Sequence, residues 1–411
     1  MAVLLIFASI FIARFKGPIG PVASDYLINA ITDAESDMGQ CLIIEMDTPG
    51  GLDESMRDII QAILNSKIPI CVYVYPSGAR AASAGAFILL SAHIAAMAPG
   101  TNAGAAHPVS MGGEKIDSIM REKMTNDAAA YAISLADKRK RNKRWAEDIV
   151  RRSISTPAKE AVRIGAVDLL AENETQLITQ LDGRLVKTET SEKRIKTTDQ
   201  PIRRIPMSVK HQLLLILTNP NIAYILLLIG IYGLFFELQN PGAIFPGVFG
   251  TIALILAFYS FQMLPINYAG VALIILAGIL FILELQITSH GLLTIGGIIS
   301  FVLGSIILFE SDVPYLRTSM SLIAIAAVIT GLFFLFIVGL GIRAQFKKPK
   351  TGTEGLIGVS GTAKTQVKNS GTVLVHGELW KAESDETIKA GTKIVVAEVK
   401  EGMVLKVKKA E

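Results

Sequence analysis

The first 175 residues contain short apolar runs that alternate with helical patterns. The run "CLIIEMD" is followed by "LDESMRDIIQAILNS", and "IPICVYVYP" precedes the next mixed segment. Strands that alternate with helices of this length predict a parallel sheet in an α/β domain. Residues 176–212 are polar and rich in Lys, Arg and Thr, so we expect a partly strand-like linker there that leads to a membrane surface.

A long apolar region covers residues 213–342. Pro, Gly and charged residues divide it into runs long enough to cross a bilayer, at roughly 219–237, 244–263, 269–287, 291–309 and 320–342. We expect about five membrane helices, which would place the two ends of the chain on opposite sides. Four crossings with one re-entrant run would reverse that conclusion. Basic residues flank both ends of the region, so the positive-inside rule alone leaves the orientation open.

Two segments of the apolar region resemble each other. "FELQNPGAIFPG" and "LELQITSHGLLTIG" share Glu-Leu-Gln at a helix end, followed by a turn that contains Gly. Glu237 and Glu284 therefore end the first and third crossings, on the same side. We predict that they are interfacial residues of a duplicated hairpin; a functional site at membrane level is the alternative.

Residues 355–411 have the pattern of a water-exposed domain again. Short β-rich runs separated by Gly turns predict a small five-stranded barrel of the OB type. Barrels of this kind can bind oligonucleotides through stacked aromatic side chains, but residues 355–411 contain few aromatic residues, with Trp380 as the single Trp. We therefore expect a module that interacts with a protein or lies close to the membrane.

The composition supports a membrane protein. Apolar residues make up 51% of the chain and charged residues only 18%, which is too apolar for a purely soluble protein. The net charge of +4 comes without a long basic tract, which argues against nucleic-acid binding. Cys41 and Cys71 lie in apolar runs without metal-ligand spacing, so we expect both in the core, with no disulfide and no metal site.

The amino-terminal run "MAVLLIFASIFIA", residues 1–13, resembles the apolar part of a signal peptide. It lacks a basic start and continues directly into the first predicted strand. A truncated and an atypical signal segment both remain open at this point.

Two turns of the α/β domain have more specific content than the pattern requires. In "EMDTPGG" a strand ends in Pro-Gly-Gly before a helix that starts near Asp53. Gly50 and Gly51 let the backbone point its amides into a site, as an oxyanion hole requires, although a common strand-to-helix turn explains the same residues. In "GARAASAGAFILLSA" the apolar periodicity begins only after Ser83, which places this serine at a helix start.

Ser83 has three interpretations. A helix start favours a developing oxyanion, and the small neighbours Ala82 and Ala84 leave room for a substrate carbonyl, so Ser83 can be a nucleophile. It can also be an ordinary N-cap of a buried helix. A membrane helix is excluded because the run from Ala81 to Ala92 is too short to span a bilayer.

Three motifs together resemble one family. "DTPGG", "GARAASAG" and "MAPGTNAGAAHPV", in this order and followed by a multi-spanning region and a small barrel, resemble the full-length NfeD-family membrane serine proteases of the Clp-protease fold group. The resemblance covers essentially the whole chain. It implies a ClpP/crotonase-like α/β spiral for the first domain, a Ser/Lys catalytic dyad and a stomatin- or prohibitin-like partner.

The resemblance also implies the residues of the site. The nucleophile would be Ser83, and the backbone N–H groups of Gly50 or Gly51 together with Ala84 would form the oxyanion hole. The catalytic lysine of the family precedes a Thr-Asn pair, and in "REKMTNDAAAYAISLA" the match falls on Lys123. A lysine acts as a base only when its pKa is lowered, and this charged run also fits a solvated surface lysine.

His107 is the rival base, because imidazole has a suitable pKa without special burial. A triad would also need a carboxylate, and in "DIVRRSISTP" Arg151 and Arg152 occupy the expected place, with Asp148 a few residues away. We therefore prefer Lys123. We expect structural roles for the remaining histidines, which are His93, His211, His290 and His376.

These features predict an ATP-independent endopeptidase that cleaves extended apolar segments of membrane-associated proteins in quality control. No metal or organic cofactor is implied, and no phosphate-binding Gly-x-x-x-x-Gly-Lys loop occurs. The expected partners are a stomatin-like membrane protein, the lipid bilayer and further copies of the chain. The resemblance places the protease domain outside the cytoplasm and the barrel inside. The alternative is a membrane scaffold that organises stomatin-like partners and lipid microdomains without proteolysis.

Overall fold

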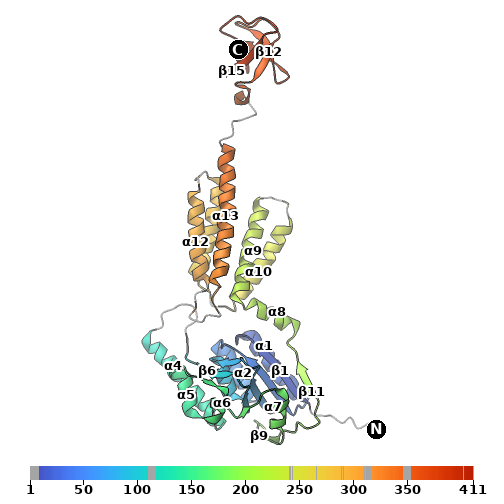
Figure 1. Ribbon diagram of the computed structural model, residues 1–411, viewed down its shortest axis with the longest axis vertical. Helices are drawn as coiled ribbons and strands as arrows, with labels where there is room; N and C mark the ends of the chain where they lie inside the picture. Colours follow the sequence, from blue (N-terminus) through green and yellow to red (C-terminus); the bar gives the residue numbers. More distant parts are fainter. Residues whose placement is uncertain are drawn as a thin grey trace, which may run out of the picture. The chain divides into compact units, whose positions relative to one another are not determined.

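The computed structural model describes residues 9–109, 117–239, 242, 244–264, 266–287, 289, 291–309, 311, 316–345, 353–400 and 402–410. The chain divides into two compact units, residues 1–278 with 299–327 and residues 279–298 with 328–411. Along the sequence, an α/β domain is followed by a series of apolar helices and a small barrel (Figure 1).

A six-stranded sheet forms the centre of the α/β domain. Its strand order is β11-β1-β2-β3-β5-β8, and every neighbouring pair is parallel. The apolar runs of the sequence form these strands, because a sheet covered on both faces needs apolar side chains at nearly every position. The strands are β1 (Ile10–Lys16), β2 (Cys41–Asp47), β3 (Ile70–Val74), β5 (Ile94–Met97), β8 (Leu169–Leu170) and β11 (Ile202–Ile205).

After β3 and again after β5, the chain enters a second, three-stranded sheet before it forms the next helix. The strands of this sheet are β4 (Arg80–Ala82), β6 (Asn102–Gly104) and β7 (Ser155–Pro157). A strand-strand-helix unit thus recurs along the domain, and this is the ClpP-like spiral that the resemblance implied. The predicted α/β class is confirmed.

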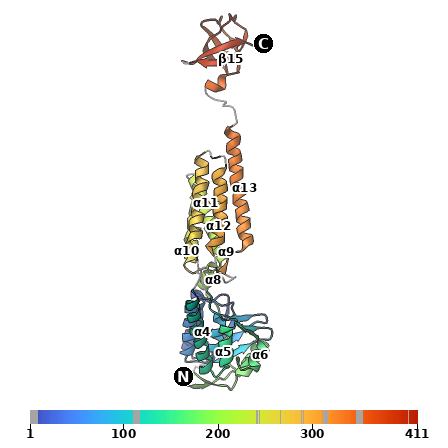
Figure 2. The same ribbon diagram turned by 90° about the vertical axis from the view of Figure 1, so that its left-hand side faces the viewer.

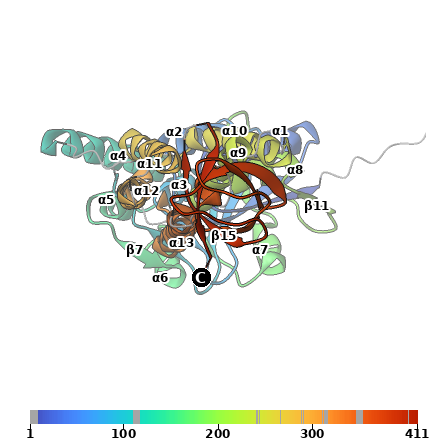
Figure 3. The same ribbon diagram turned by 90° about the horizontal axis from the view of Figure 1, so that it is seen from above.

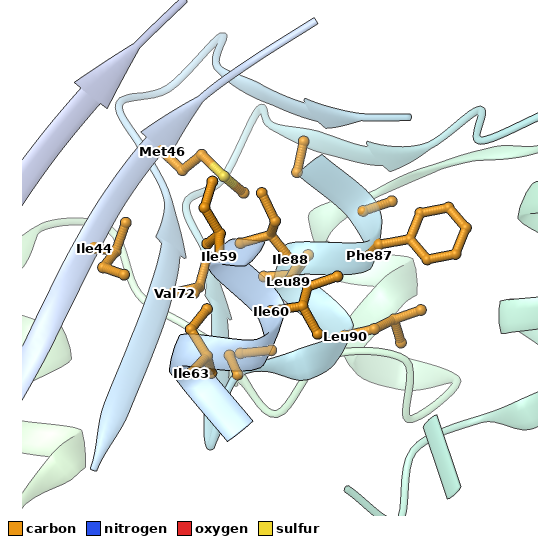
Figure 4. Packing of buried hydrophobic residues seen from close by; sticks show 14 of the residues in the cluster. Ile44, Met46, Ile59, Ile60, Ile63, Val72, Phe87, Ile88, Leu89 and Leu90 are labelled. Carbon is orange, nitrogen blue, oxygen red and sulfur yellow. The ribbon is translucent and has the colours of Figure 1, made fainter. Parts of the chain in front are cut away.

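Helices cover both faces of the large sheet, because alternate strand residues point to opposite faces. One apolar cluster lies between the sheet and α1 to α5, and a second lies between the sheet and α7. In the view from above, α1 and α7 lie on opposite sides of the domain (Figure 3). In the first cluster, Ile60 and Leu89 lie among the side chains that cover Ile44 and Val72 (Figure 4). Helices α4 and α5 contact each other closely (Figure 2). The helices are α1 (Pro21–Ser36), α2 (Asp53–Leu64), α3 (Ala84–Ser91), α4 (Ser118–Lys138), α5 (Lys143–Arg151), α6 (Ala158–Arg163) and α7 (Glu174–Leu181).

The segment 176–212, which we expected to be a linker, belongs largely to the α/β domain. Helix α7 buries Leu177 and Leu181 against the second face of the sheet. A hairpin of β9 (Leu185–Lys187) and β10 (Glu192–Arg194) follows, and β11 then pairs with β1 at the sheet edge. The polar composition concealed this strand because an edge strand can expose most of its side chains.

A buried carboxyl group lies in the cluster that α7 covers. Glu45 in β2 is fully buried and pairs in register with Arg14 of β1 and Tyr73 of β3. Nε of Arg14 lies 3.7 Å from Oε2 of Glu45, and neither carboxylate oxygen has a hydrogen-bond partner among the described residues. Burial, together with the nearby charge of Glu174, raises the pKa of Glu45 to about 7. This side chain is therefore partly protonated near neutral pH.

The two cysteines lie in the same cluster. Cys41 and Cys71 are both buried and both free, as predicted. Burial raises the pKa of the Cys41 thiol to about 12, so this thiol stays protonated and unreactive at neutral pH.

A short helix, α8 (Val209–Leu217), precedes the apolar helices. The helices that follow are α9 (Pro220–Gln239), α10 (Ile244–Phe261), α11 (Tyr268–Gln286), α12 (Leu292–Leu308) and α13 (Met320–Gln345). By length and composition, α9 and α10 can each cross a membrane, and the apolar parts of the other three are somewhat shorter. Many large apolar side chains on these helices are exposed, as lipid-facing side chains would be.

Glycines allow close contact within both predicted hairpins. A Cβ on Gly233 of α9 would lie 2.7 Å from Cα of Gly250 in α10. A Cβ on Gly270 of α11 would lie 2.6 Å from the backbone N of Leu308 in α12. Small residues let helix backbones approach each other in a membrane, where apolar surface alone gives no preference for protein over lipid. The two hairpins therefore share one construction.

Glu284 has a structural role at the second hairpin. Its carboxylate accepts hydrogen bonds from Oγ of Ser289 at 2.6 Å, the backbone N–H of Gly291 at 3.0 Å and that of Thr294 at 2.9 Å. It thus binds free amides at the start of α12. Glu237 packs on α10, where a Cβ on Gly247 would lie 2.9 Å from its Cγ. The interfacial interpretation of Glu237 and Glu284 stays a prediction.

The carboxyl-terminal residues form a closed five-stranded barrel in the order β12-β13-β14-β16-β15, as predicted. A short 3₁₀ helix, η2 (Thr353–Leu356), precedes it. The barrel interior contains small and branched apolar side chains such as Val373, Ile394 and Leu405. The strands are β12 (Ser360–Ala363), β13 (Gly371–Val375), β14 (Glu378–Glu383), β15 (Lys393–Lys400) and β16 (Val404–Lys409).

We predict that Glu45→Gln stabilises the α/β domain at pH 8.5 and has little effect at pH 5. Folding raises the pKa of this acid to about 7, so the protonated form favours the native state and stability falls as the pH rises toward that value. The amide removes the cost of a buried charge. Thermal unfolding, followed by Trp145 fluorescence in a Trp380→Phe background, measures the effect. The exposed Glu192→Gln is the control, and an equal shift of Glu45→Gln at both pH values would contradict the prediction.

Candidate active site

Ser83 occupies a strained turn between β4 and α3. Its backbone has φ 50° and ψ −118°, a region that a residue with a side chain rarely adopts. The turn is fixed on both sides, because the N–H of Ser83 donates to the carbonyl of Gly104 at 2.9 Å and the N–H of Ala86 donates to the carbonyl of Ser83 at 2.9 Å. A strained strand-to-helix turn of this kind is typical of serine nucleophiles.

The side chain of Ser83 does not act as a helix cap. Ser83 precedes α3 as predicted, yet its hydroxyl makes no capping hydrogen bond. The N-cap interpretation therefore explains the position of Ser83 but not the direction of its side chain. Ser83 lines a cleft of about 420 Å³.

The Pro-Gly-Gly loop lies directly beside Ser83. Strand β2 continues into Thr48, whose N–H donates to the carbonyl of Arg80 at 2.8 Å, and the N–H of Ala82 donates to the carbonyl of Thr48 at 3.1 Å. A Cβ on Gly50 would lie 2.6 Å from Cβ of Ser83, so only glycine fits at this position. The loop and the serine turn therefore hold each other in place.

The structure distinguishes the two candidate glycine amides. The N–H of Gly50 donates to Oγ1 of Thr48 at 3.1 Å, which occupies it. The N–H groups of Gly51 and Ala84 have no acceptor among the described residues. Gly51 and Ala84 both line the cleft together with Ser83. Of the three amides expected for an oxyanion hole, those of Gly51 and Ala84 are thus unoccupied among the described residues, whereas that of Gly50 is occupied.

Apolar side chains line most of the cleft. Met56 comes from α2, Phe87 from α3 and Met124 from α4. At the rim, Arg57 pairs with Asp53 and with Asp127, both at 2.8 Å, and its guanidinium lies 4.6 Å from the ring centre of Tyr131. This network links α2 to α4 across the rim, and the sequence analysis did not detect it.

His107 lines the same cleft, and it also lines a neighbouring polar cavity of about 360 Å³. Its Nδ1 lies 3.0 Å from the carbonyl of Val150. A proton on Nδ1 satisfies this contact and leaves Nε2 as an acceptor. The carboxylate of Asp148 instead lies 3.5 Å from Arg152, so the third member of a triad would be a carbonyl rather than a carboxylate.

Lys123 lies outside the cleft in this conformation. It is exposed on the first half of α4, and its neighbour Met124 lines the cleft in its place. Residues 110–116, which precede α4 in the sequence, lie outside the described residues. The structure therefore brings Ser83, Gly51, Ala84 and His107 together, and it does not bring Lys123 to them.

Three other histidines have different surroundings. His93 is largely buried and accepts a hydrogen bond from the N–H of Ile70 at 3.3 Å. Burial and the nearby Arg139 lower the pKa of His93 to about 3, so it stays neutral. His211 pairs with Asp25, and His376 lies in a turn before β14. His290 is outside the described residues.

Two residues of the site had no signal of their own in the sequence analysis. Thr48 and Gly85 hold the serine turn against the glycine loop, since a Cβ on Gly85 would lie 2.4 Å from Cγ2 of Thr48. Both belong to the quoted motifs "DTPGG" and "GARAASAG", so their types were visible although their contact was not.

Three domain models match the chain in sequence order. They are the NfeD1b N-terminal domain at residues 11–194, the NfeD integral membrane domain at residues 221–340 and the NfeD-like C-terminal, partner-binding domain at residues 353–409. A solved structure of a lysine-to-alanine variant of the 1510-N membrane-bound stomatin-specific protease, in complex with a substrate peptide, is 35% identical. It covers 50% of this chain and 95% of that chain, with a TM-score of 0.47.

Two curated relatives match nearly the whole chain. Membrane-bound protease PH1510 of Pyrococcus horikoshii is 37% identical over 403 residues, which cover 95% of this chain and 91% of that protein. Membrane protein NfeD1b of Bacillus subtilis is 32% identical over 423 residues, with 92% and 90% covered. The chain therefore belongs to the NfeD family, in the full-length form that joins a protease-type domain to a membrane domain and a partner-binding domain.

Proposed function

We propose that this protein is a membrane-bound serine endopeptidase in which Ser83 is the nucleophile. The observation that carries the proposal is the strained turn at Ser83, which lines a cleft together with two residues whose amides have no acceptor in the described part of the chain. In the reaction, Oγ of Ser83 gives its proton to the base and attacks a peptide carbonyl. The C–N bond then breaks, the amine leaves with that proton, and water hydrolyses the resulting acyl-enzyme to release the acid and restore Ser83. The relationship to a membrane-bound protease supports the same activity.

The oxyanion hole of this proposal consists of the N–H groups of Gly51 and Ala84. Both groups start without an acceptor, so each can donate to the negative oxygen of the tetrahedral intermediate at no cost in protein hydrogen bonds. Gly50 has a different role: its positive φ of 113° and its lack of a side chain allow the loop to approach Ser83.

We assign the role of the base to Lys123. The family motif supports this assignment, as does the place of Lys123 beside Met124, which lines the cleft. The assignment requires the first turns of α4 to bring the exposed Lys123 toward Ser83 when substrate binds, where burial would lower its pKa. His107 is the competing base, because it already lines the cleft and, among the described residues, only its Nδ1 has a hydrogen-bond partner.

We propose extended apolar segments of membrane-associated proteins as substrates. The apolar lining of the cleft supports this choice. The Pyrococcus protease is named in solved structures as specific for a stomatin homologue, so a stomatin-like protein is the proposed partner or substrate, with a role in membrane protein quality control. The partner-binding domain at residues 353–409 fits such a role.

We further propose a homo-oligomer with five membrane crossings, the protease domain outside the cytoplasm and the barrel inside.

We predict that Ser83→Ala abolishes cleavage of casein or an apolar peptide, with a loss of about 10⁶-fold that reaches background, because no nucleophile remains. The exposed Ser36→Ala should cleave as the parent does. Undiminished cleavage by Ser83→Ala would contradict the proposal. If the parent itself shows no cleavage while the chain still assembles a stomatin-like partner, the scaffold function replaces it.

Gly51→Ala should destroy the oxyanion loop. A Cβ at Gly51 would lie 1.9 Å from the carbonyl oxygen of Ile19, so the backbone must move. We expect a loss of roughly 10²- to 10³-fold in kcat, as for the loss of one oxyanion donor. Gly20→Ala is the matched control, because a Cβ there meets no atom within 4 Å. Equal kcat values for the two variants would contradict the assignment.

Single substitutions should identify the base. With Lys123 as the base, Lys123→Ala loses roughly 10²- to 10⁴-fold in kcat while His107→Ala keeps most activity. Lys138→Ala, at the other end of α4, is the control. A loss of this size in His107→Ala, with most activity kept in Lys123→Ala, would assign the base to His107 instead.

A further inference from the structure

One face of α8 is attached to the α/β domain. Nε2 of His211 lies 2.7 Å from Oδ2 of Asp25 in α1, and its ring lies 6.2 Å from that of Tyr26. Leu215 packs against the apolar cluster of the domain. The side chain of Ser208 caps the helix by accepting a hydrogen bond from the N–H of His211. The helix is therefore a fixed part of the domain surface.

The opposite face of α8 is apolar and exposed. Val209, Leu213 and Ile216 are 71%, 58% and 52% exposed with all the chain's residues present. Their spacing of four and three residues places them on one side of the helix, away from His211 and Leu215. We call these three residues the α8 stripe. A soluble surface rarely offers such a stripe on an element that is otherwise well anchored.

The place of α8 in the chain indicates what covers the stripe. The helix ends at Leu217, and the membrane-crossing helix α9 begins at Pro220. The NfeD integral membrane domain matches from residue 221. The stripe is therefore within a few residues of the point where the chain enters the bilayer. A helix with one apolar face at this point has the composition of an interfacial helix.

We propose that α8 is an interfacial helix whose stripe lies at the boundary between lipid headgroups and acyl chains. Apolar burial carries the contact more than charge does. Arg203 and Arg204, which precede the helix, are already paired with Asp37 at 3.0 Å and with Glu174 at 2.6 Å. Lys210 is the exposed cation beside the stripe and can extend to the headgroups. The contact therefore does not require anionic lipid.

This contact deepens the proposed function and rests on it for its catalytic consequence. Since α8 is joined to α1 and to the main apolar cluster, its contact with lipid fixes the α/β domain at one height above the bilayer. The substrates reached from there are segments that emerge from the same bilayer. The interfacial helix thus selects membrane-proximal substrates by position, in addition to the apolar lining of the cleft.

Spin labels on the full chain in neutral phosphatidylcholine nanodiscs test the lipid contact. Leu213→Cys and Ile216→Cys carry the label, and the native Cys41 and Cys71 are too buried to react. Leu185→Cys, on β9 and 59% exposed, is the matched control. We expect labels on α8 to meet oxygen more readily than a water-soluble nickel complex, and the control label to show the reverse. Equal behaviour of all three labels, or protection of the α8 labels from both reagents by other protein, would overturn the proposal.

The catalytic consequence is tested by the double variant Leu213→Asp with Ile216→Asp. We expect it to lose most cleavage of a membrane-anchored substrate and to keep its cleavage of a soluble peptide. A double alanine variant should lose less, because it adds no charge to the interface. Equal loss on both substrates would overturn the positioning role. A parent without any peptidase activity would refute the proposed function alone, because the labelling result does not depend on cleavage.

Discussion

The site depends on the pairing between the end of β2 and the start of β4. Through Thr48, two backbone hydrogen bonds join the glycine loop to the strand that ends in Ser83. The methyl group of Thr48 occupies the space that a side chain at Gly85 would need. The glycine loop follows β2 and the serine turn follows β4, so the two belong to separate strand-helix units. The Thr48 contact joins them into one surface of the cleft. Hydrogen bonds from Ser83 to Gly104 and between the loop and Ile19 hold each part separately, and the Thr48 contact fixes the two parts relative to each other.

The architecture could be predicted from the sequence because its signals are local. Buried parallel strands appear as continuous apolar runs. Long apolar runs indicate membrane helices, and β-rich segments separated by Gly indicate a small barrel. Strand β11 shows the limit of this reasoning. Three of its four residues are exposed, and only its pairing with β1, far away in the sequence, makes it part of the sheet. A long-range pairing leaves no periodicity in a polar edge strand.

The site was predictable in its residue types and less so in its distances. Ser83 at a helix start and a glycine loop beside it follow from the motifs alone. The choice between Gly50 and Gly51 does not, since it depends on the hydroxyl of Thr48, which occupies one amide and leaves the other free. The positions of Lys123 and His107 likewise depend on how α4 and the segment after β6 pack, and neither leaves a signature in the sequence.

Helix α3 is buried on all sides, whereas the beginning of α4 is exposed. The proposed nucleophile and the proposed oxyanion donor Ala84 therefore lie at the start of a buried helix, whereas the proposed base lies on an exposed part of α4. The described conformation is therefore a resting state in the proposed mechanism, because Lys123 lies outside the cleft. In the proposed mechanism, Lys123 reaches Ser83 only when contacts with the substrate bring the first turns of α4 toward the cleft. Such a substrate-dependent step would restrict cleavage to those membrane proteins that bind the cleft well enough to move α4.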